Sequence, residues 1–216
     1  MRNKTDTHPA SFSKGEILAN VITHGIGVCL SIAGIVFLII RAINQGTKWH
    51  LIGFIVFGIS LLLLYLASTI YHCFTRQPLK ALLRIFDHAA IFFLIAGTYT
   101  PFLLIKLRNG LGWSFFAIIW ALSIIGLIIN LVFKSRFEKP PVFLYLAISW
   151  LGVIVFYQVI SKIGMLSISL LLSGGIFYTS GIIFYRWRKL PYNHAIWHMF
   201  VLCGSILHYF SILQLT

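Results

Sequence analysis

Long apolar runs alternate with short charged breaks along this 216-residue chain. A helix needs about 20 apolar residues to cross roughly 30 Å of hydrocarbon, and seven runs meet that length. They lie near residues 17–40, 50–72, 84–105, 112–133, 142–160, 164–185 and 194–214. The pattern therefore predicts an all-α membrane protein built as a bundle of seven transmembrane helices.

The breaks between these runs are short and leave no room for a second domain. Residues 1–16 are polar and predict a short tail outside the bilayer. The run that follows is long enough to span, so we do not interpret it as a cleaved signal peptide. Only residues 161–164 separate the fifth and sixth runs, which we interpret as a tight helical hairpin because one continuous helix would far exceed the bilayer. We expect a single domain over residues 1–216.

Basic residues fall unevenly on the two sides of the predicted bundle. Of the 17 Lys and Arg residues, twelve lie in the tail and in the breaks after the second, fourth and sixth runs, and five lie in the other breaks. Lys and Arg concentrate on the cytoplasmic side of membrane proteins. We therefore predict a cytoplasmic N-terminus, a C-terminus on the opposite side and a multi-pass location in the inner (plasma) membrane of the cell.

The overall composition fits a bilayer better than water, since 59% of the residues are hydrophobic and 10% are charged, against about a quarter charged in soluble domains. The formal net charge of +13 would indicate nucleic-acid binding if the positions of the charged residues were ignored. Here the basic residues lie where they orient helices and meet anionic headgroups. We expect membrane lipids as partners and no nucleic acid, and the sequence leaves the oligomeric state open.

Ionisable groups inside hydrocarbon are costly, so each one is a functional candidate. His72 ends the second run, Asp87 begins the third, and His194 and His198 begin the seventh. At about 1.5 Å per residue these four groups lie within roughly 5–14 Å of the same membrane face. Three helices are thus predicted to bring possible metal ligands to one depth.

The spacing of His194 and His198 is i and i+4, which places both imidazoles on one helical face where they can bind one ion. A zincin helix has Glu after its first His, but Ala195 stands there, so metalloprotease chemistry of that kind does not transfer. With His72 as a third ligand, the set predicts a Zn²⁺ site whose fourth position is open, as in catalytic zinc sites.

Two further side chains fit roles beside such an ion. Ser68 lies one turn from His72, where its hydroxyl can orient a ligand or a substrate oxygen. Asp87 can hold a water at the metal and accept its proton, or serve as a fourth ligand. We therefore predict Asp87 and Ser68 as catalytic residues.

The remaining polar groups have structural interpretations. His50 and His208 lie towards the opposite membrane face and are expected to be packing residues, while His88 points about 100° away from Asp87 on its helix. His24 continues an i, i+4 series with Glu16 and Asn20, so it either supports the site or merely packs. The three cysteines, Cys29, Cys73 and Cys203, are too scattered for a disulfide framework and are interpreted as packing residues.

Four segments together resemble the hemolysin III proteins of bacteria, which are similar to the adiponectin and progestin receptors of animals. They are residues 16–27 (EILANVITHGIG), 68–72 (STIYH), 87–101 (DHAAIFFLIAGTYTP) and 193–198 (NHAIWH). The resemblance covers about 200 residues from Glu16 onwards. It implies zinc ligands at His72, His194 and His198, contact of Asp87 with zinc through water, and a family serine at Ser68.

The resemblance extends to alkaline ceramidases and implies a zinc-dependent hydrolase acting on a membrane lipid amide or ester. In that mechanism Asp87 moves the proton and Ser68 holds the developing oxyanion. One alternative is a pore-forming cytolysin, which the few charged residues support poorly. The other is a non-catalytic membrane sensor or homeostasis protein in which zinc only links three helices. The substrate lipid, the actual metal and the roles of Glu16, Asn20, His24 and His88 stay open.

Overall fold

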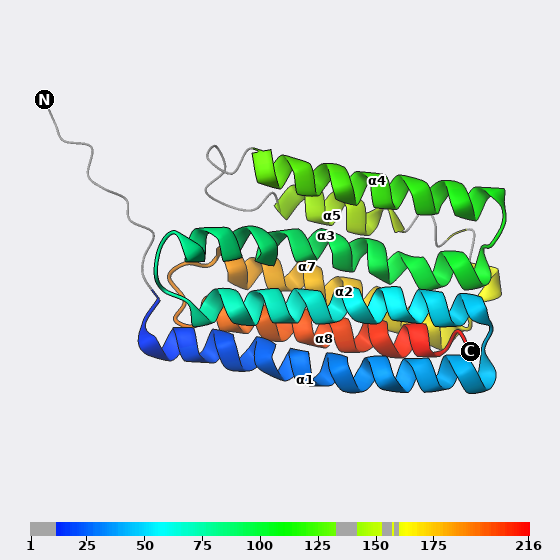
Figure 1. Cartoon of the computed structure of the whole chain (residues 1–216), viewed down its shortest axis with the longest axis horizontal. Helices are drawn as coiled ribbons and strands as arrows, with labels where there is room; N and C mark the ends of the chain where they lie inside the picture. Colours follow the sequence, from blue (N-terminus) through cyan, green and yellow to red (C-terminus); the bar gives the residue numbers. More distant parts are fainter. Residues whose placement is uncertain (1–11, 133–141, 153–156, 158–159) are drawn as a thin grey trace, which may run out of the picture.

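The structure is a computed structural model that describes residues 12–132, 142–152, 157 and 160–216. Every regular element within these ranges is helical. With the labels of Figure 1, the elements are α1 (Lys14–Gln45), α2 (Lys48–Cys73), α3 (Leu79–Lys106), α4 (Gly110–Val132), α5 (Val142–Trp150), the short 3₁₀ helix η1 (Ile160–Lys162), α7 (Met165–Arg186) and α8 (Asn193–Leu213).

Six of the described helices are long and apolar enough to cross a membrane: α1, α2, α3, α4, α7 and α8. Each contains or closely overlaps a predicted run, which confirms an all-helical protein with several crossings. The fifth predicted run, residues 142–160, falls partly on residues outside the described ranges, and its residues 142–150 form α5.

Local capping explains why two helices begin before their apolar runs. At α1 the Ser13 Oγ accepts the Glu16 amide at 3.2 Å, while the Glu16 carboxylate accepts the Ser13 amide at 2.8 Å. At α2 Thr47 and His50 form the same reciprocal arrangement. Such capping boxes satisfy amide groups that the first helical turn leaves free, so α1 begins at Lys14, before the predicted residue 17, and α2 begins at Lys48, before the predicted residue 50.

The long helices run roughly parallel to one another in one bundle (Figure 1). α1 packs between α2 and α8, α8 packs against α7, and α3 contacts α2, α4, α5 and α8. The most apolar window of α3 is 67% buried, against 22% in α1 and 17% in α4. α3 is therefore the most buried of the described spanning helices.

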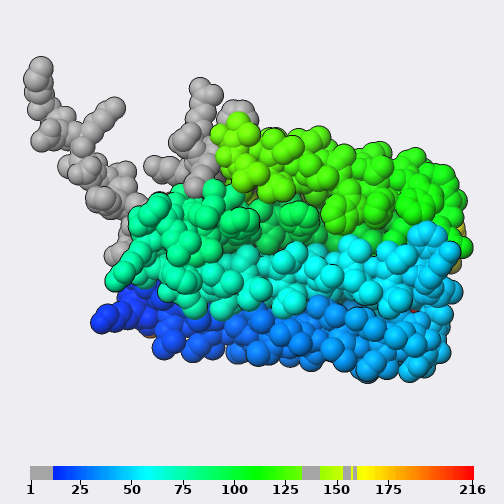
Figure 2. Space-filling view, viewed as in Figure 1, coloured from blue at the N-terminus to red at the C-terminus, as the bar shows by residue number. Residues whose placement is uncertain are grey.

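The outer surface of the bundle is apolar and its interior carries the polar side chains. Figure 2 shows one broad face on which α1 to α4 lie side by side. Ile43 is 68% exposed and Ile183 64%, as expected for side chains that meet lipid. Asn20, His24 and His198 are by contrast buried. This is the pattern of a multi-pass integral membrane protein.

The sequence analysis interpreted the three cysteines as packing residues, and the structure contradicts this. Cys29, Cys73 and Cys203 are all exposed in the structure and none is paired with another. The interpretation was wrong because an apolar neighbourhood in the sequence does not say whether a helical position faces lipid or a neighbouring helix.

One end of the bundle collects the predicted site residues. α1, α3 and α8 begin there, and α2 and α7 end there; we call it the site end (Figure 1). The chain finishes at the other end, which we call the far end. His72, Asp87 and His194 thus lie at one level, as their positions in the sequence predicted.

Candidate metal centre

His72, His194 and His198 come together at the site end. One ring nitrogen from each lies within 4.8 Å of those of the other two. The ring centroids are 5.0 Å apart for His72 and His194, 5.1 Å for His72 and His198, and 4.5 Å for the helical pair. Three imidazoles at this separation suit one small divalent cation.

The Nε2 atoms of the three histidines are buried and have no hydrogen-bond partner in the described part of the chain. His72 is 2% exposed and His198 is fully buried. Buried polar atoms are normally satisfied, and a shared cation is one group that satisfies three converging imidazole nitrogens at once. The residues present therefore fit a bound metal, and His72, His194 and His198 are the residues to hold it.

Thr23 on α1 sets the orientation of His198. Its hydroxyl donates to backbone carbonyls one turn earlier, at Ala19 and Asn20, and its Oγ1 lies 3.2 Å from His198 Nδ1. With the hydroxyl proton already used, Nδ1–H donates to Thr23, and Nε2 carries the free lone pair. This is the kind of hydrogen bond that fixes the tautomer of a metal-binding histidine.

The start of α8 is held against α1 by Glu16. The Glu16 carboxylate accepts the Tyr192 amide at 3.1 Å, in addition to capping its own helix. Phe12, just before α1, packs its ring on His194 at 5.5 Å and on His72 at 6.2 Å. These contacts position His194 and cover the histidine group from the site end.

Asp87 is outside the group of three histidines. Its carboxyl is within hydrogen-bonding reach of the Ser68 hydroxyl, and Ser68 is 1% exposed. Asp87 and His194 line the same cavity, whereas Ser68 is not among its described lining residues. The arrangement places a carboxylate at the cavity wall with a buried hydroxyl behind it.

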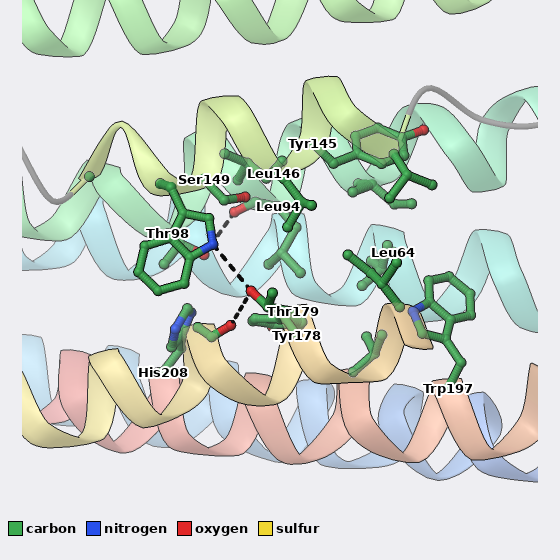
Figure 3. A pocket seen from close by; sticks show the side chains of 18 of the residues that line it. Leu64, Leu94, Thr98, Tyr145, Leu146, Ser149, Tyr178, Thr179, Trp197 and His208 are labelled. Atoms are coloured by element: carbon green, nitrogen blue, oxygen red, sulfur yellow. Dashed lines mark hydrogen bonds between the residues drawn. The ribbon is translucent and has the colours of Figure 1, made fainter. Parts of the chain in front are cut away.

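An apolar cavity of about 190 Å³ runs from the histidines into the bundle. Figure 3 shows side chains from α2, α3, α5, α7 and α8 around it, among them Leu64 of α2 and Trp197 of α8. Asp87 is the one formally charged residue among the described lining residues. A mostly apolar lining of this kind suits a hydrocarbon chain.

The far part of the cavity has a few polar groups. The Trp150 indole donates to Thr179 Oγ1 at 3.2 Å, and His208 pairs its Nε2 with the Leu171 carbonyl at 3.0 Å. His208 thus bonds across to α7, while His50 caps its own helix, α2, through Thr47; each of these two histidines has at least one ring nitrogen with a protein partner. His88 lines the cavity rather than joining the three histidines.

Some residues around the centre were missed by sequence reasoning. Nothing in the local sequence marks Thr23 or Phe12 as site residues. Thr23 contacts His198, 175 positions further along the chain, and Phe12 contacts His72 and His194, which are at least 60 positions away. His24 was left open between support and packing, and its ring stacks on His198 with 3.5 Å between centroids. The helical spacing of Glu16, Asn20 and His24 predicted one shared face of α1, but the stacking of His24 on His198 depends on how α1 packs against α8.

Comparison with known proteins covers nearly the whole chain. The family described as Haemolysin-III related matches residues 12–209. The chain is 48% identical to "Hemolysin-3 homolog" of Bacillus subtilis (strain 168) over 202 residues, 94% of this chain and 95% of that protein. It is 48% identical to "Hemolysin-3" of Bacillus cereus over 207 residues, 96% and 94% of the two chains. "Monocyte to macrophage differentiation factor" of Homo sapiens is 26% identical over 205 residues, 91% and 83% of the two chains.

Proposed function

The chain belongs to the Haemolysin-III related family, and from that premise we propose that it is a zinc-dependent hydrolase acting on the amide or ester bond of a membrane lipid. The observation that carries the proposal is the position of the histidine group. Within the described residues, three buried Nε2 atoms without hydrogen-bond partners converge beside an apolar cavity whose lining includes one carboxylate, that of Asp87.

In the proposed reaction His72, His194 and His198 hold the zinc. Zinc bound by three histidines supplies an acidified water and polarises a carbonyl. As a water molecule adds to the carbonyl carbon, Asp87 would accept a proton from that water and return it to the departing amine or alcohol as the C–N or C–O bond breaks. The cavity holds the acyl chain and keeps bulk water from the carboxylate.

Ser68 supports Asp87 in this proposal. Its hydroxyl is buried and faces the carboxyl rather than the described lining of the cavity. A hydroxyl in that position donates a hydrogen bond that orients the carboxylate for proton transfer. The sequence led us to expect that Ser68 donates directly to the oxyanion. Because Ser68 is not among the described lining residues of the cavity, we instead propose the orienting role.

The test is hydrolysis by the purified protein in detergent. Incubated with N-acyl amides and acyl esters, the protein should release fatty acid detectable by mass spectrometry. Release should stop on chelation and return with added Zn²⁺, and a His194→Ala protein that still elutes as a folded species should be inactive. Release that persists in either case excludes the proposed mechanism.

Two competing functions give different results in the same preparation. The first is permeabilisation of membranes, which the name of the relative Hemolysin-3 suggests. It predicts that the purified protein causes dye leakage from liposomes. The sparse charge along the described cavity lining argues against a conducting pore. A purely structural zinc predicts neither activity, with a fall in thermal stability on chelation.

We also propose seven crossings with a cytoplasmic N-terminus. Six helices are long enough to span, and the start of α1 and the end of the chain lie at opposite ends of the bundle, as an odd number requires (Figure 1). The basic residues favour the site end as the cytoplasmic one.

An alkaline phosphatase fused to the C-terminus should be active, because that enzyme matures only outside the cytoplasm. An inactive but intact fusion would contradict the orientation.

A further inference from the structure

The apolar cavity continues well beyond the histidine group. On α3 its lining extends from Asp87 to Phe102, 15 positions later, which corresponds to about 22 Å of helix. On α7 it extends from Tyr185, whose ring centroid lies 5.8 Å from that of His194, back to Leu171. Because α7 ends at the site end, Leu171 marks a part of the cavity far from the proposed metal.

One face of α7 forms a wall of this cavity. Its lining residues recur at intervals of three or four positions, as a helical face requires, and include Leu172, Gly175, Thr179, Ile182 and Tyr185. At about 3.6 residues per turn, Gly175 lies in the middle of that face. A side chain at this position would therefore point into the cavity.

Neither the backbone nor the packing of the helices requires glycine at position 175. Gly175 lies inside α7, and no described glycine has a positive φ. Beyond its own helix backbone and chain neighbours, no described atom lies within 4 Å of the place that a Cβ would take. At Gly174, by contrast, a Cβ would overlap the His208 ring of α8. Glycine weakens a helix interior, so the space that Gly175 leaves in the cavity is the best explanation for it.

The level of Gly175 divides the cavity into a near and a distant part. Gly175 precedes Tyr185 by ten positions, about 15 Å along α7. Figure 3 shows Thr179, one turn from Gly175, and His208 in one part of the cavity and Trp197 in the other. An extended hydrocarbon chain, with C–C bonds of about 1.5 Å, advances about 1.3 Å per carbon, so a chain that starts at the histidine group reaches Gly175 after about twelve carbons.

We propose that Gly175 sets the length of the hydrocarbon chain that the cavity accepts, and that this chain is longer than about twelve carbons. The part of the cavity between Gly175 and Leu171 holds the end of the chain. The inference rests on the proposed function, because it defines the acyl chain of the lipid that is cleaved. Binding of a chain does not depend on turnover, so the two can fail separately.

The experiment measures the thermal stability of the full protein, at one fixed detergent concentration, with the octyl, dodecyl and hexadecyl ethers of glycerol. These ethers share one neutral headgroup and cannot be hydrolysed. The hexadecyl ether should raise the melting temperature of the unmodified protein. In Gly175→Leu this rise should be lost, because the leucine side chain fills the cavity where the long chain passes. The response to the octyl ether, whose chain ends short of this level, should equal that of the unmodified protein.

Gly25→Leu is the matched control. Gly25 also lies inside a helix, α1, with no described atom within 4 Å of its Cβ position, and it is not among the described lining residues of the cavity. This variant should respond to all three ethers as the unmodified protein does. Gly175→Ala, which adds one methyl group, should lower the response to the hexadecyl ether less than Gly175→Leu does. The zinc content of every variant should match that of the unmodified protein.

The proposed role of Gly175 is overturned if the hexadecyl ether fails to stabilise the unmodified protein or stabilises Gly175→Leu equally well. Equal loss of the octyl and hexadecyl responses in Gly175→Leu also overturns it, and so does a Gly175→Leu protein that does not fold, since the position would then serve packing. If fatty-acid release is never detected while the hexadecyl response depends on residue 175, the proposed reaction fails and the chain site stands. Release with the same chain-length preference in Gly175→Leu and the unmodified protein has the opposite meaning.

Discussion

The His198→Ala protein is expected to bind almost no zinc, against about one ion per chain in the unmodified protein. His198 is fully buried, and its Nε2 belongs to the group of ring nitrogens within 4.8 Å of one another. Two histidines that remain cannot complete a three-ligand site. Elemental analysis of purified protein, normalised to protein concentration, measures the loss.

His50→Ala is the control for the removal of a histidine as such. His50 accepts the Thr47 amide at 3.1 Å and lies at the far end of α2, so zinc should be retained. Equal zinc in the His198→Ala and unmodified proteins would show that the three histidines are not the binding site.

The neighbouring Thr23 should give a graded effect in the same measurement. Thr23→Val removes the acceptor of His198 Nδ1–H but keeps the side-chain shape, and loss of such a partner typically weakens metal binding by about 10–100-fold. Thr69→Val is matched to it, because Thr69 donates to the Tyr65 carbonyl and contacts no histidine in the described hydrogen bonds. Competition with a zinc indicator compares the affinities.

The Asp87→Asn protein is expected to lose lipid hydrolysis by about 10²–10⁴-fold, the range that general acid–base catalysis contributes, while it keeps its zinc. Asparagine has the shape of the carboxyl group but cannot take up a proton. Initial rates of fatty-acid release, measured beside elemental analysis of the same samples, separate the two effects.

Controls for Asp87 come from α2. Ser68→Ala should lower turnover less than Asp87→Asn, since Ser68 acts by orienting the carboxylate. Ser60→Ala, which removes a buried hydroxyl bonded to the Phe57 carbonyl, should have little effect. Loss of zinc together with activity in Asp87→Asn would assign Asp87 as a ligand, and full activity would exclude it from the reaction.

Much of the candidate site could be predicted because the relevant information is local. The depth of His72, Asp87 and His194 follows from their distance to the ends of apolar runs, since the rise of a helix is constant. The i, i+4 relation of His194 and His198 follows from helical periodicity alone. The structure agrees with both predictions for the histidines, since the rings of His72, His194 and His198 converge and those of His194 and His198 are 4.5 Å apart.

Contacts between distant residues could not be predicted in this way. Hydropathy gives neither the rotation of a helix about its axis nor its neighbours, which is why the exposed Cys29, Cys73 and Cys203 were misjudged. The same limit hid Thr23 and Phe12, whose partners are on other helices. The cavity likewise depends on side chains from α1, α2, α3, α5, α7 and α8 together.

The sequence by itself determined that this is a helical membrane protein and that its histidines lie near one face of the bilayer, because hydrophobic length and helical rise act within single segments. Only the tertiary structure decided that three imidazoles share one point, that His24 stacks on one of them, and that an apolar cavity ends there. Those features arise from side chains packing between helices, and packing is a property of the whole bundle.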